Sequence, residues 1–190
     1  RQEGSRGMKD AVKLGGFLMI VCVLASLGLA YTNKATAPVI AEQKELARKQ
    51  AMSKVLPAAE TFEQKTNDTG SGPEIYSIGI DADGNPVGYV FQVAPKGYGG
   101  AIKTMVGLDL EGNVTGVEIM EMQETPGLGA KAAGPAFLGQ FQGKDADQLY
   151  LSDKDEKRGA IDGITAATIT SKAVTKGVRQ GTEAMNNVLR

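Results

Sequence analysis

The sequence predicts an α+β domain that follows one N-terminal membrane-spanning helix. An uncharged, largely apolar run occupies residues 14–33. Two segments with matching acid-Gly-Asn turns, around Gly84 and Gly112, then predict antiparallel β-hairpins. Near the C-terminus, apolar residues spaced three and four apart predict a helix with one buried face. Hairpins flanked by helices are typical of the α+β class.

The apolar run at residues 14–33 is long enough, as a helix, to cross the roughly 30 Å core of a bilayer. It has no polar face, which argues against a helix lying on the membrane surface. A cleaved signal peptide is the alternative, because basic residues precede the run and Gly28 and Ala30 suit a peptidase site. The run is longer than the roughly 7 to 15 apolar residues of a signal core, so we expect a retained anchor.

The charges that flank this run predict its orientation. Lys9 and Lys13 precede it, and only Lys34 follows closely. By the positive-inside rule, residues 1–13 lie in the cytoplasm and the C-terminal domain is extracytoplasmic, in a single-pass protein of the cell (inner) membrane. Residues 1–7 have the look of a cloning remnant, and the charge bias holds without them.

Composition excludes several classes of site. With one cysteine, Cys22, and no histidine, the chain alone cannot build a disulfide framework, a cysteine-ligated iron–sulfur cluster or a Cys/His zinc site. An apolar filler is the plainest interpretation of Cys22, and a cluster shared with partner chains is the alternative. Basic and acidic residues number 21 and 22, for a formal net charge of −1, so nothing points to a nucleic-acid partner.

The segment that follows the anchor should lift the domain off the membrane. Thr36 and Pro38 suit a helix start, and apolar residues then recur at helical spacing up to Pro57. We expect residues 34–73 to form this helix and a linker, and residues 74–190 to form the outer domain. The turn-rich stretch 67–73 marks the loop between them.

Within the outer domain, two hairpins form a meander and short elements follow. The expected elements are strands 75–81 and 87–93, strands 102–110 and 114–120, a short helix at 135–140, a short strand at 148–151, and a final helix with Thr170 or Ser171 as its N-cap. A doubly wound nucleotide fold is not expected, because no Gly-x-Gly-x-x-Gly turn follows an early strand.

The most informative segment lies just ahead of the final helix, at residues 162–171, and reads DGITAATITS. It resembles the Asp-x-x-(Ser/Thr)-(Gly/Ala)-Ala-Thr pattern of covalently flavinylated extracytoplasmic domains, whose last threonine, here Thr168, carries flavin mononucleotide (FMN) through its phosphate. Ala166 stands where glycine is commoner. A helix N-terminus stabilises a phosphate, because it presents free N–H groups and about half a positive charge. An ordinary hydroxyl-rich N-cap loop is the plain alternative.

Two glycine-rich loops add to this motif. Residues 124–129, ETPGLG, follow a predicted strand, and their glycines permit close approach of backbone to a planar ligand. Residues 97–103, GYGGAIK, include Tyr98, whose ring suits a flavin face. Plain turns are the alternative for both loops. Three lysines suit the negative charge of a reduced flavin, although solvated positions are their ordinary role: Lys96, Lys103 and Lys131.

In this order, the anchor, the Gly-Tyr-Gly-Gly loop, the Glu-Thr-Pro-Gly-Leu-Gly loop and the C-terminal motif resemble the G subunit of the Rnf ferredoxin:NAD oxidoreductase complex. The C subunit of the sodium-translocating NADH:quinone oxidoreductase shares these motifs and is one alternative. A membrane-tethered binding or scaffold module without a cofactor is an alternative of another class. A stand-alone flavin reductase is a third, which the lack of a nucleotide-binding fingerprint disfavours.

The resemblance implies a redox relay with no catalytic residue of its own. FMN on Thr168 would pass electrons within a membrane complex that couples flow between ferredoxin and NAD to Na⁺ or H⁺ movement. It implies as partners the other membrane and peripheral subunits of the Rnf complex, a flavin transferase for maturation, and membrane lipid. The residues assigned to the cofactor are Tyr98, Gly99, Glu124, Thr125, Gly127, Leu128, Gly129, Lys131, Thr165, Ala167, Thr168 and Ser171.

Overall fold

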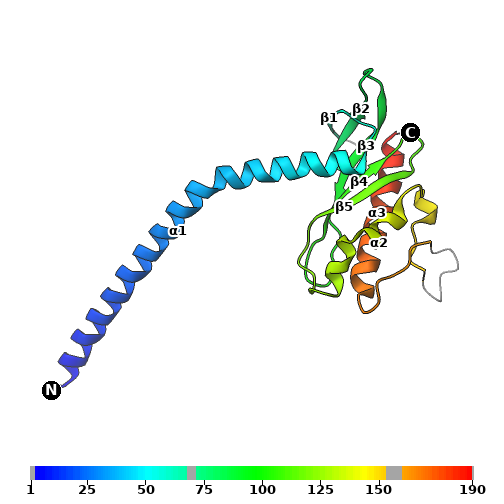
Figure 1. Ribbon diagram of the computed structural model, residues 1–190. Coiled ribbons are helices and arrows are strands. Elements are labelled where there is room, and N and C mark those ends of the chain that lie inside the picture. The colour runs from blue at the N-terminus through cyan, green and yellow to red at the C-terminus, as the bar shows by residue number, and fades with distance from the viewer. Residues whose placement is uncertain (1–2, 68–71, 153–159, 190) are drawn as a thin grey trace. The chain divides into compact units, whose positions relative to one another are not determined.

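The computed structural model describes residues 3–67, 72–152 and 160–189. The chain divides into two compact units, Arg1–Leu46 and Ala47–Arg190. A single helix, α1 (Glu3–Val55), supplies all the described structure of the first unit and contributes its last turns to the second. The second unit contains every strand and every other helix of the described residues (Figure 1).

Helix α1 does not begin anew at Thr36–Pro38, so that prediction was wrong. Pro38 lies inside the helix, which continues to Val55, close to the predicted end at Pro57. Proline holds φ near −65°, a helical value, and removes only one backbone hydrogen bond from the ladder. The Thr36 hydroxyl donates to the carbonyl oxygen of Thr32 at 3.0 Å in the preceding turn. One proline therefore leaves the helix continuous.

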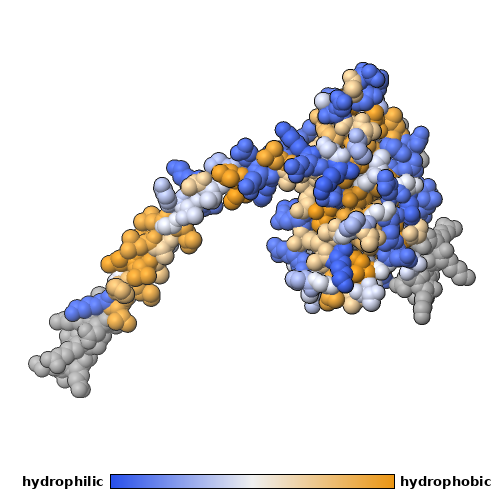
Figure 2. All heavy atoms as spheres, viewed as in Figure 1, coloured by the Kyte–Doolittle hydropathy of each residue, from blue (hydrophilic) through white to orange (hydrophobic). Residues whose placement is uncertain are grey.

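The N-terminal part of α1 is apolar on all sides. Its large hydrophobic side chains between Leu14 and Leu29 are exposed, and Figure 2 shows them as an orange segment of the helix. Among the described residues, α1 is the one helix with the length and composition to cross a membrane. A helix with exposed apolar residues all round needs an apolar surrounding, which a bilayer supplies.

The second unit is built on a five-stranded antiparallel sheet in the order β1-β2-β3-β4-β5. Its strands are β1 (Thr61–Thr66), β2 (Ile75–Ile80), β3 (Pro86–Val93), β4 (Lys103–Leu108) and β5 (Val114–Glu121). The two predicted hairpins are confirmed as β2–β3 and β4–β5, and β3 pairs with β4 to complete the predicted meander.

Both hairpin turns have the expected glycine geometry. Gly84 and Gly112 adopt φ of 85° and 88°, values that residues with a side chain rarely take. In each turn an aspartate closes the loop on itself. Asp81 accepts the N–H of Asn85 at 2.8 Å, and Asp109 accepts the N–H of Asn113 at 2.8 Å. The matching acid-Gly-Asn sequences thus form matching turns.

The sheet is covered on both faces. Helix α3 (Thr168–Leu189) lies along one face (Figure 1), where Val174, Val178 and Met185 are fully buried in a core with Phe91 and Val106. The C-terminal end of α1 packs on the opposite face. The residues of this second core are Ala51, Met52, Val55, Leu56, Ala59, Val90 and Met105.

Two paired glycines of the sheet allow the end of α1 to contact the sheet backbone directly. Gly107 pairs with Gly116 across β4 and β5, and a Cβ on Gly107 would lie 2.3 Å from the backbone oxygen of Val55. The Thr115 hydroxyl donates a hydrogen bond to that same oxygen. The helix end therefore rests directly on sheet backbone, a contact that side chains at these positions would prevent.

Three further sequence-based expectations need correction. Strand β1 was not predicted from the sequence. Only Phe62 of this edge strand is partly buried, so no alternation of apolar residues marks it. The expected strand at 148–151 is absent. A 3-10 turn, η3 (Ala146–Gln148), forms at its start, and the Asp145 side chain accepts the Gln148 N–H. Residue Leu151 forms only an isolated bridge with Ile161.

The third correction concerns the start of α3. The helix begins at Thr168, so the expected N-caps Thr170 and Ser171 lie inside its first turn, and both are buried. The expected helix at 135–140 is present as α2 (Pro135–Leu138), which continues into the 3-10 turn η2 (Gly139–Phe141). A further 3-10 turn, η1 (Gly129–Ala133), precedes it.

Candidate functional site

Three segments far apart in the sequence meet around one open cavity at the N-terminal end of α3. The segments are the loop that contains Tyr98, the loop after β5, and the turn that leads into α3. The cavity has a volume of about 430 Å³. Its lining residues are Tyr98, Glu124, Thr125, Leu128, Gly129, Ala166, Ala167, Thr168, Ile169 and Thr170.

Thr168 lies at the first position of α3, and its side chain is exposed. The first N–H groups of a helix have no partner in the preceding turn, and the helix dipole adds about half a positive charge there. A 22-residue helix such as α3 presents both features at its start. The Thr168 hydroxyl therefore stands at a position suited to an attached or bound phosphate.

The turn before Thr168 is held by side chains from two other elements. The Gln140 amide binds both backbone groups of Asp162: its Oε1 accepts the Asp162 N–H at 2.7 Å, and its Nε2 donates to the Asp162 carbonyl at 3.3 Å. Ser171 Oγ accepts the Ile164 N–H and donates to the Ala167 carbonyl, both at 3.0 Å. Ser171 thus supports the turn from beneath instead of lining the cavity.

Ala166 adopts φ of 62° and is the one non-glycine residue with positive φ among the described residues. This left-handed conformation costs an alanine about 1–2 kcal/mol relative to its ordinary backbone. It occurs at the motif position where glycine is commoner, which gives that preference a physical cause. The turn places Ala166 in the cavity wall, two residues before Thr168.

Glu124 joins all three segments. Its side chain is only 8% exposed, and its Oε1 accepts the Gly99 N–H at 3.1 Å while its Oε2 accepts the Thr170 hydroxyl at 2.7 Å. Gly97 and Gly129 let backbone close around the carboxylate, since a Cβ on either would lie 2.3 Å and 2.6 Å from its oxygens. Glu124 therefore fixes the arrangement of the cavity walls.

The rim of the cavity is apolar. Tyr98, Leu128 and Ile169 are 72%, 42% and 58% exposed, although large apolar side chains are usually covered. Sequence reasoning singled out the first two and missed Ile169, Thr170 and Ala166 as lining residues. The available signal was their closeness in sequence to Thr168: Ala166 precedes the helix by two residues, and Ile169 and Thr170 lie in its first turn.

Five expected residues lie outside the cavity lining. Gly99 contributes its N–H to Glu124, and Gly127 adopts φ of 78° in the loop after β5. Lys131, in η1, and Thr165 are exposed and do not line the cavity, while Ser171 supports the turn. Of the other lysines considered, Lys103 pairs with Glu121 at 2.6 Å and Lys96 is exposed.

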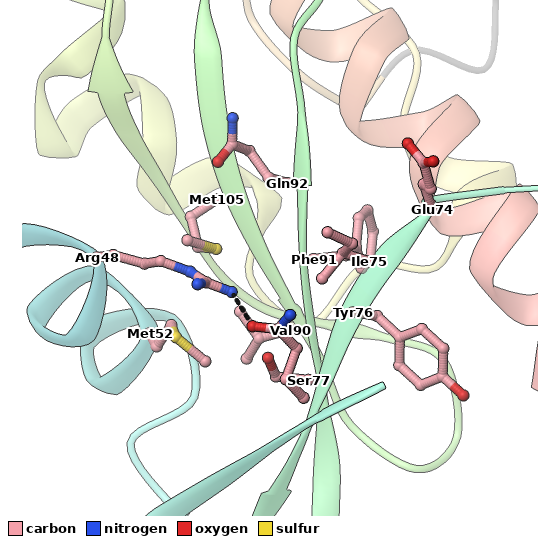
Figure 3. Close-up of a pocket in the computed structure, with 11 residues that line it drawn as sticks. Arg48, Met52, Glu74, Ile75, Tyr76, Ser77, Val90, Phe91, Gln92 and Met105 are labelled. Carbon is pink, nitrogen blue, oxygen red and sulfur yellow. Dashed lines mark hydrogen bonds between the residues drawn. The ribbon is translucent and has the colours of Figure 1, made fainter. Parts of the chain in front are cut away.

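A second cavity, of about 450 Å³, lies on the opposite face of the sheet (Figure 3). Arg48 of α1 reaches across it and donates to the Gln64 side chain at 3.2 Å, above a floor that includes Val90 and Met105. None of the expected cofactor residues lies there. Within the described residues, no cluster of three or more His, Cys, Asp or Glu side chains is arranged to hold a metal ion.

Comparison with known proteins bears on the region around the first cavity. The family described as FMN-binding domain matches residues 97–183. This range contains all three segments that line the cavity.

Similar proteins of known assignment cover nearly the whole chain. The G subunit of the Na(+)-translocating ferredoxin:NAD(+) oxidoreductase complex of Acetobacterium woodii is 35% identical over 95% of this chain and 94% of its own length. The G subunit of the proton-translocating ferredoxin:NAD(+) oxidoreductase complex of Clostridium ljungdahlii is 34% identical over 87% of this chain and 86% of its own.

Solved structures share the fold of a large part of this chain. The C subunit of the Na(+)-translocating NADH-quinone reductase from Parabacteroides distasonis matches with a TM-score of 0.51 and 26% identity, over 61% of this chain and 63% of that one. The corresponding protein of Shewanella oneidensis, NqrC, has a TM-score of 0.50 and 22% identity, over 70% and 71% of the two chains, and supports the fold alone.

Proposed function

This chain belongs to the family of G subunits of ion-translocating ferredoxin:NAD(+) oxidoreductase complexes, and from that premise we propose that it relays electrons through FMN held covalently on Thr168. It is an electron-transfer subunit with an FMN-binding domain. The finer points, covalent attachment through a phosphoester and the residues around the flavin, are the proposal.

One observation carries the covalent assignment. Thr168 is an exposed hydroxyl at the first position of α3, on the wall of a cavity within the matched FMN-binding region. A phosphate esterified there would lie against the free N–H groups of the helix start. No other threonine that lines the cavity combines exposure with this position, because Thr170 is buried and Thr125 lies in the loop after β5.

The residues around the cavity fit FMN. Its phosphate suits the helix start at Thr168, and its ring suits the exposed apolar side chains of Tyr98, Leu128 and Ile169. The bound flavin supplies the redox chemistry. The chain's own contribution is to hold the walls in place through Glu124 and to support the attachment turn through Gln140 and Ser171.

The remaining assignments follow from membership of a membrane complex. The apolar N-terminal helix makes this a membrane-anchored subunit. We place the span at residues 14–33, the N-terminus in the cytoplasm, and the FMN-binding domain, residues 74–190, outside the inner membrane. A flavin transferase would form the ester, because no base lies near Thr168 in the sequence and the chain lacks histidine, a common general base. Lipid would contact the span, and the other subunits of the complex would supply and accept electrons, coupled to Na⁺ or H⁺ movement.

The alternatives lose support. A C subunit of the sodium-translocating NADH:quinone oxidoreductase shares the fold, but relatives 30–35% identical over nearly the full chain are G subunits. A scaffold module without a cofactor does not account for the match to an FMN-binding domain.

Mass spectrometry of the chain purified from its native membrane tests the proposal. We expect the mass of FMN less one water on the peptide that contains Thr168. An unmodified peptide, from cells with a competent flavin transferase, would exclude the ester. FMN that is present but released by denaturation would preserve the electron-transfer role and remove the covalent assignment.

A further inference from the structure

Glu124 is a buried carboxylate whose only partners in the described structure are neutral groups. It accepts one hydrogen bond from the Gly99 N–H and one from the Thr170 hydroxyl, and it is 8% exposed. No ion pair with Lys or Arg involves it in the part of the chain that the structure describes. A buried charge is ordinarily paired with an opposite charge, so this arrangement needs an explanation.

The two hydrogen bonds match a carboxylate that acts as an acceptor at both oxygens: the Gly99 N–H donates to Oε1, and the Thr170 hydroxyl donates to Oε2. If its sole task were to join three segments, a neutral glutamine would serve. Its amide oxygen would accept the Gly99 N–H and its NH₂ group would donate to the Thr170 hydroxyl. The contacts within the chain therefore do not explain why a negatively charged residue occupies this position.

The location of the charge suggests its purpose. Glu124 lines the same cavity as Thr168, within the matched FMN-binding region. Partly buried charges are screened much less than charges in open solvent. The lysines singled out from the sequence, Lys96, Lys103 and Lys131, are exposed and do not line the cavity, so water screens their opposing charge more strongly.

We propose that the buried Glu124 carboxylate holds the reduction potential of the bound flavin low, in addition to joining the walls of its cavity. Reduction adds negative charge to a flavin, and a fixed anion in the same cavity opposes that addition. The inference rests on the proposed function, because it requires FMN in this cavity. It assigns Glu124 a role as a tuning and positioning residue beyond its contacts within the chain.

Potentiometric titration of the flavin in the detergent-solubilised full chain tests this role. Glu124→Gln removes the charge and keeps the side-chain shape, so we expect a more positive midpoint potential than in the unaltered chain. Glu121→Gln is the matched control, because Glu121 is an exposed carboxylate three residues earlier, paired with Lys103. We expect its shift to stay within the scatter of replicate titrations.

A purely structural role predicts a different result. Glu124→Gln would then change the melting temperature and the hydrogen exchange of the Gly99 amide while leaving the potential unchanged, and that outcome would overturn the proposal. Should Glu124→Gln fail to fold or to hold flavin, Thr170→Val decides the matter. It keeps the charge and removes one donor, so the potential should fall, and an unchanged or raised potential would overturn the proposal.

Failure of the proposed function gives a separate signature. If the unaltered chain carries no flavin after coexpression with a flavin transferase, the FMN relay is excluded before any variant is compared. If the unaltered chain carries flavin and the Glu124→Gln potential does not move, the relay stands and only the tuning role is lost.

Discussion

Thr170 and Glu124, 46 residues apart in the chain, are joined by a buried hydrogen bond of 2.7 Å from the threonine Oγ1 to the carboxylate Oε2. This bond ties the first turn of α3 to the loop after β5, on either side of the proposed flavin cavity. A second bond from the Gly99 N–H to the same carboxylate adds the third wall. The Glu124 side chain thus holds the Gly99 loop and the first turn of α3 in place around the cavity.

Replacing Thr170 with valine should destabilise the outer domain by about 1.5–3 kcal/mol, because the bond is made to a charged group and its loss leaves a buried oxygen without a donor. Urea unfolding of the full chain in detergent measures the change. Thr165→Val is the control: Thr165 is exposed, so its substitution should stay within about 0.5 kcal/mol. Equal effects of the two substitutions would contradict the importance of this bond.

Replacing Thr168 with valine should abolish covalent FMN, since the hydroxyl that would form the ester is gone. Stability should change little, by about 0.5 kcal/mol or less, because the side chain is exposed. Flavin fluorescence of the chain after denaturing electrophoresis gives the result directly. Thr165→Val, three residues earlier in the same motif, should retain the fluorescent band. A band in Thr168→Val would move the attachment site elsewhere.

Replacing Ala166 with glycine should stabilise the domain by about 0.5–1 kcal/mol. Glycine removes the strain of φ at 62° but gains freedom in the unfolded chain, and the two effects partly cancel. The adjacent substitution Ala167→Gly should act in the opposite direction, with a loss of about 1 kcal/mol, because it deletes a buried methyl group and adds the same unfolded freedom. Thermal unfolding compares the two, and changes of the same sign would argue against strain at Ala166.

Replacing Gly107 with alanine should disrupt the seat of the α1 end on the sheet. The new Cβ would lie 2.3 Å from the Val55 oxygen, a backbone atom that cannot move independently, so we expect a loss of about 1–3 kcal/mol or more. Gly139→Ala is the control, since nothing lies within 4 Å of its added Cβ and its φ is −63°. That change should be neutral or stabilise by about 0.4–1 kcal/mol. Limited proteolysis near Val55 would report the loosened helix end, and undiminished resistance in Gly107→Ala would count against the contact.

Stability should depend on Asp81 in mildly acidic solution. The Asn85 backbone N–H, which the carboxylate accepts, lowers the pKa of Asp81 below its usual value near 3.8, with smaller contributions from other hydrogen bonds. Because the pKa of Asp81 is lower in the folded chain than in the unfolded chain, its contribution to stability is complete at pH values above the unfolded-state pKa. That contribution is lost as the pH falls through the lower folded-state pKa. The stability difference between the unaltered chain and Asp81→Asn should therefore be present at pH 7 and shrink below pH 4.

Unfolding curves at a series of pH values measure this difference. Asp83→Asn controls for the change in net charge, because the Asp83 carboxylate accepts neither of the backbone N–H bonds that Asp81 receives. A difference that stays constant from pH 7 to below pH 3 would exclude the Asp81 carboxylate as its source.

Features set by neighbours in the chain were predictable from the sequence. The apolar run at residues 14–33, the turns at Gly84 and Gly112 and the buried stripe of α3 each depend on residues within a few positions of one another. The motif that ends at Thr168 was also predictable from the sequence, since its pattern occupies one short segment. The unusual Ala166 was visible as a departure from glycine, but its φ of 62° was not.

The errors arose where packing or side-chain bonds outweighed local pattern. Strand β1 has no fully buried residue, and its backbone pairing with β2 is the main feature that defines it. At residues 148–151 the Asp145 side chain forms a turn in place of a strand. At the start of α3, Ser171 resembled a cap yet lies in the buried first turn, where it binds Ile164 and Ala167.

The apolar N-terminal helix, the hairpins, the final helix and the threonine proposed to carry the flavin could be predicted from the sequence, because each depends on a local periodicity or a short motif. Three features depend on folding in three dimensions: the burial of Glu124, the hydrogen bonds of Gly99 and Thr170 to its carboxylate, and the contact of the α1 end with glycines in β4 and β5. Such contacts join residues tens of positions apart. They form only when the sheet and its helices pack, and no local pattern records which distant groups will then meet.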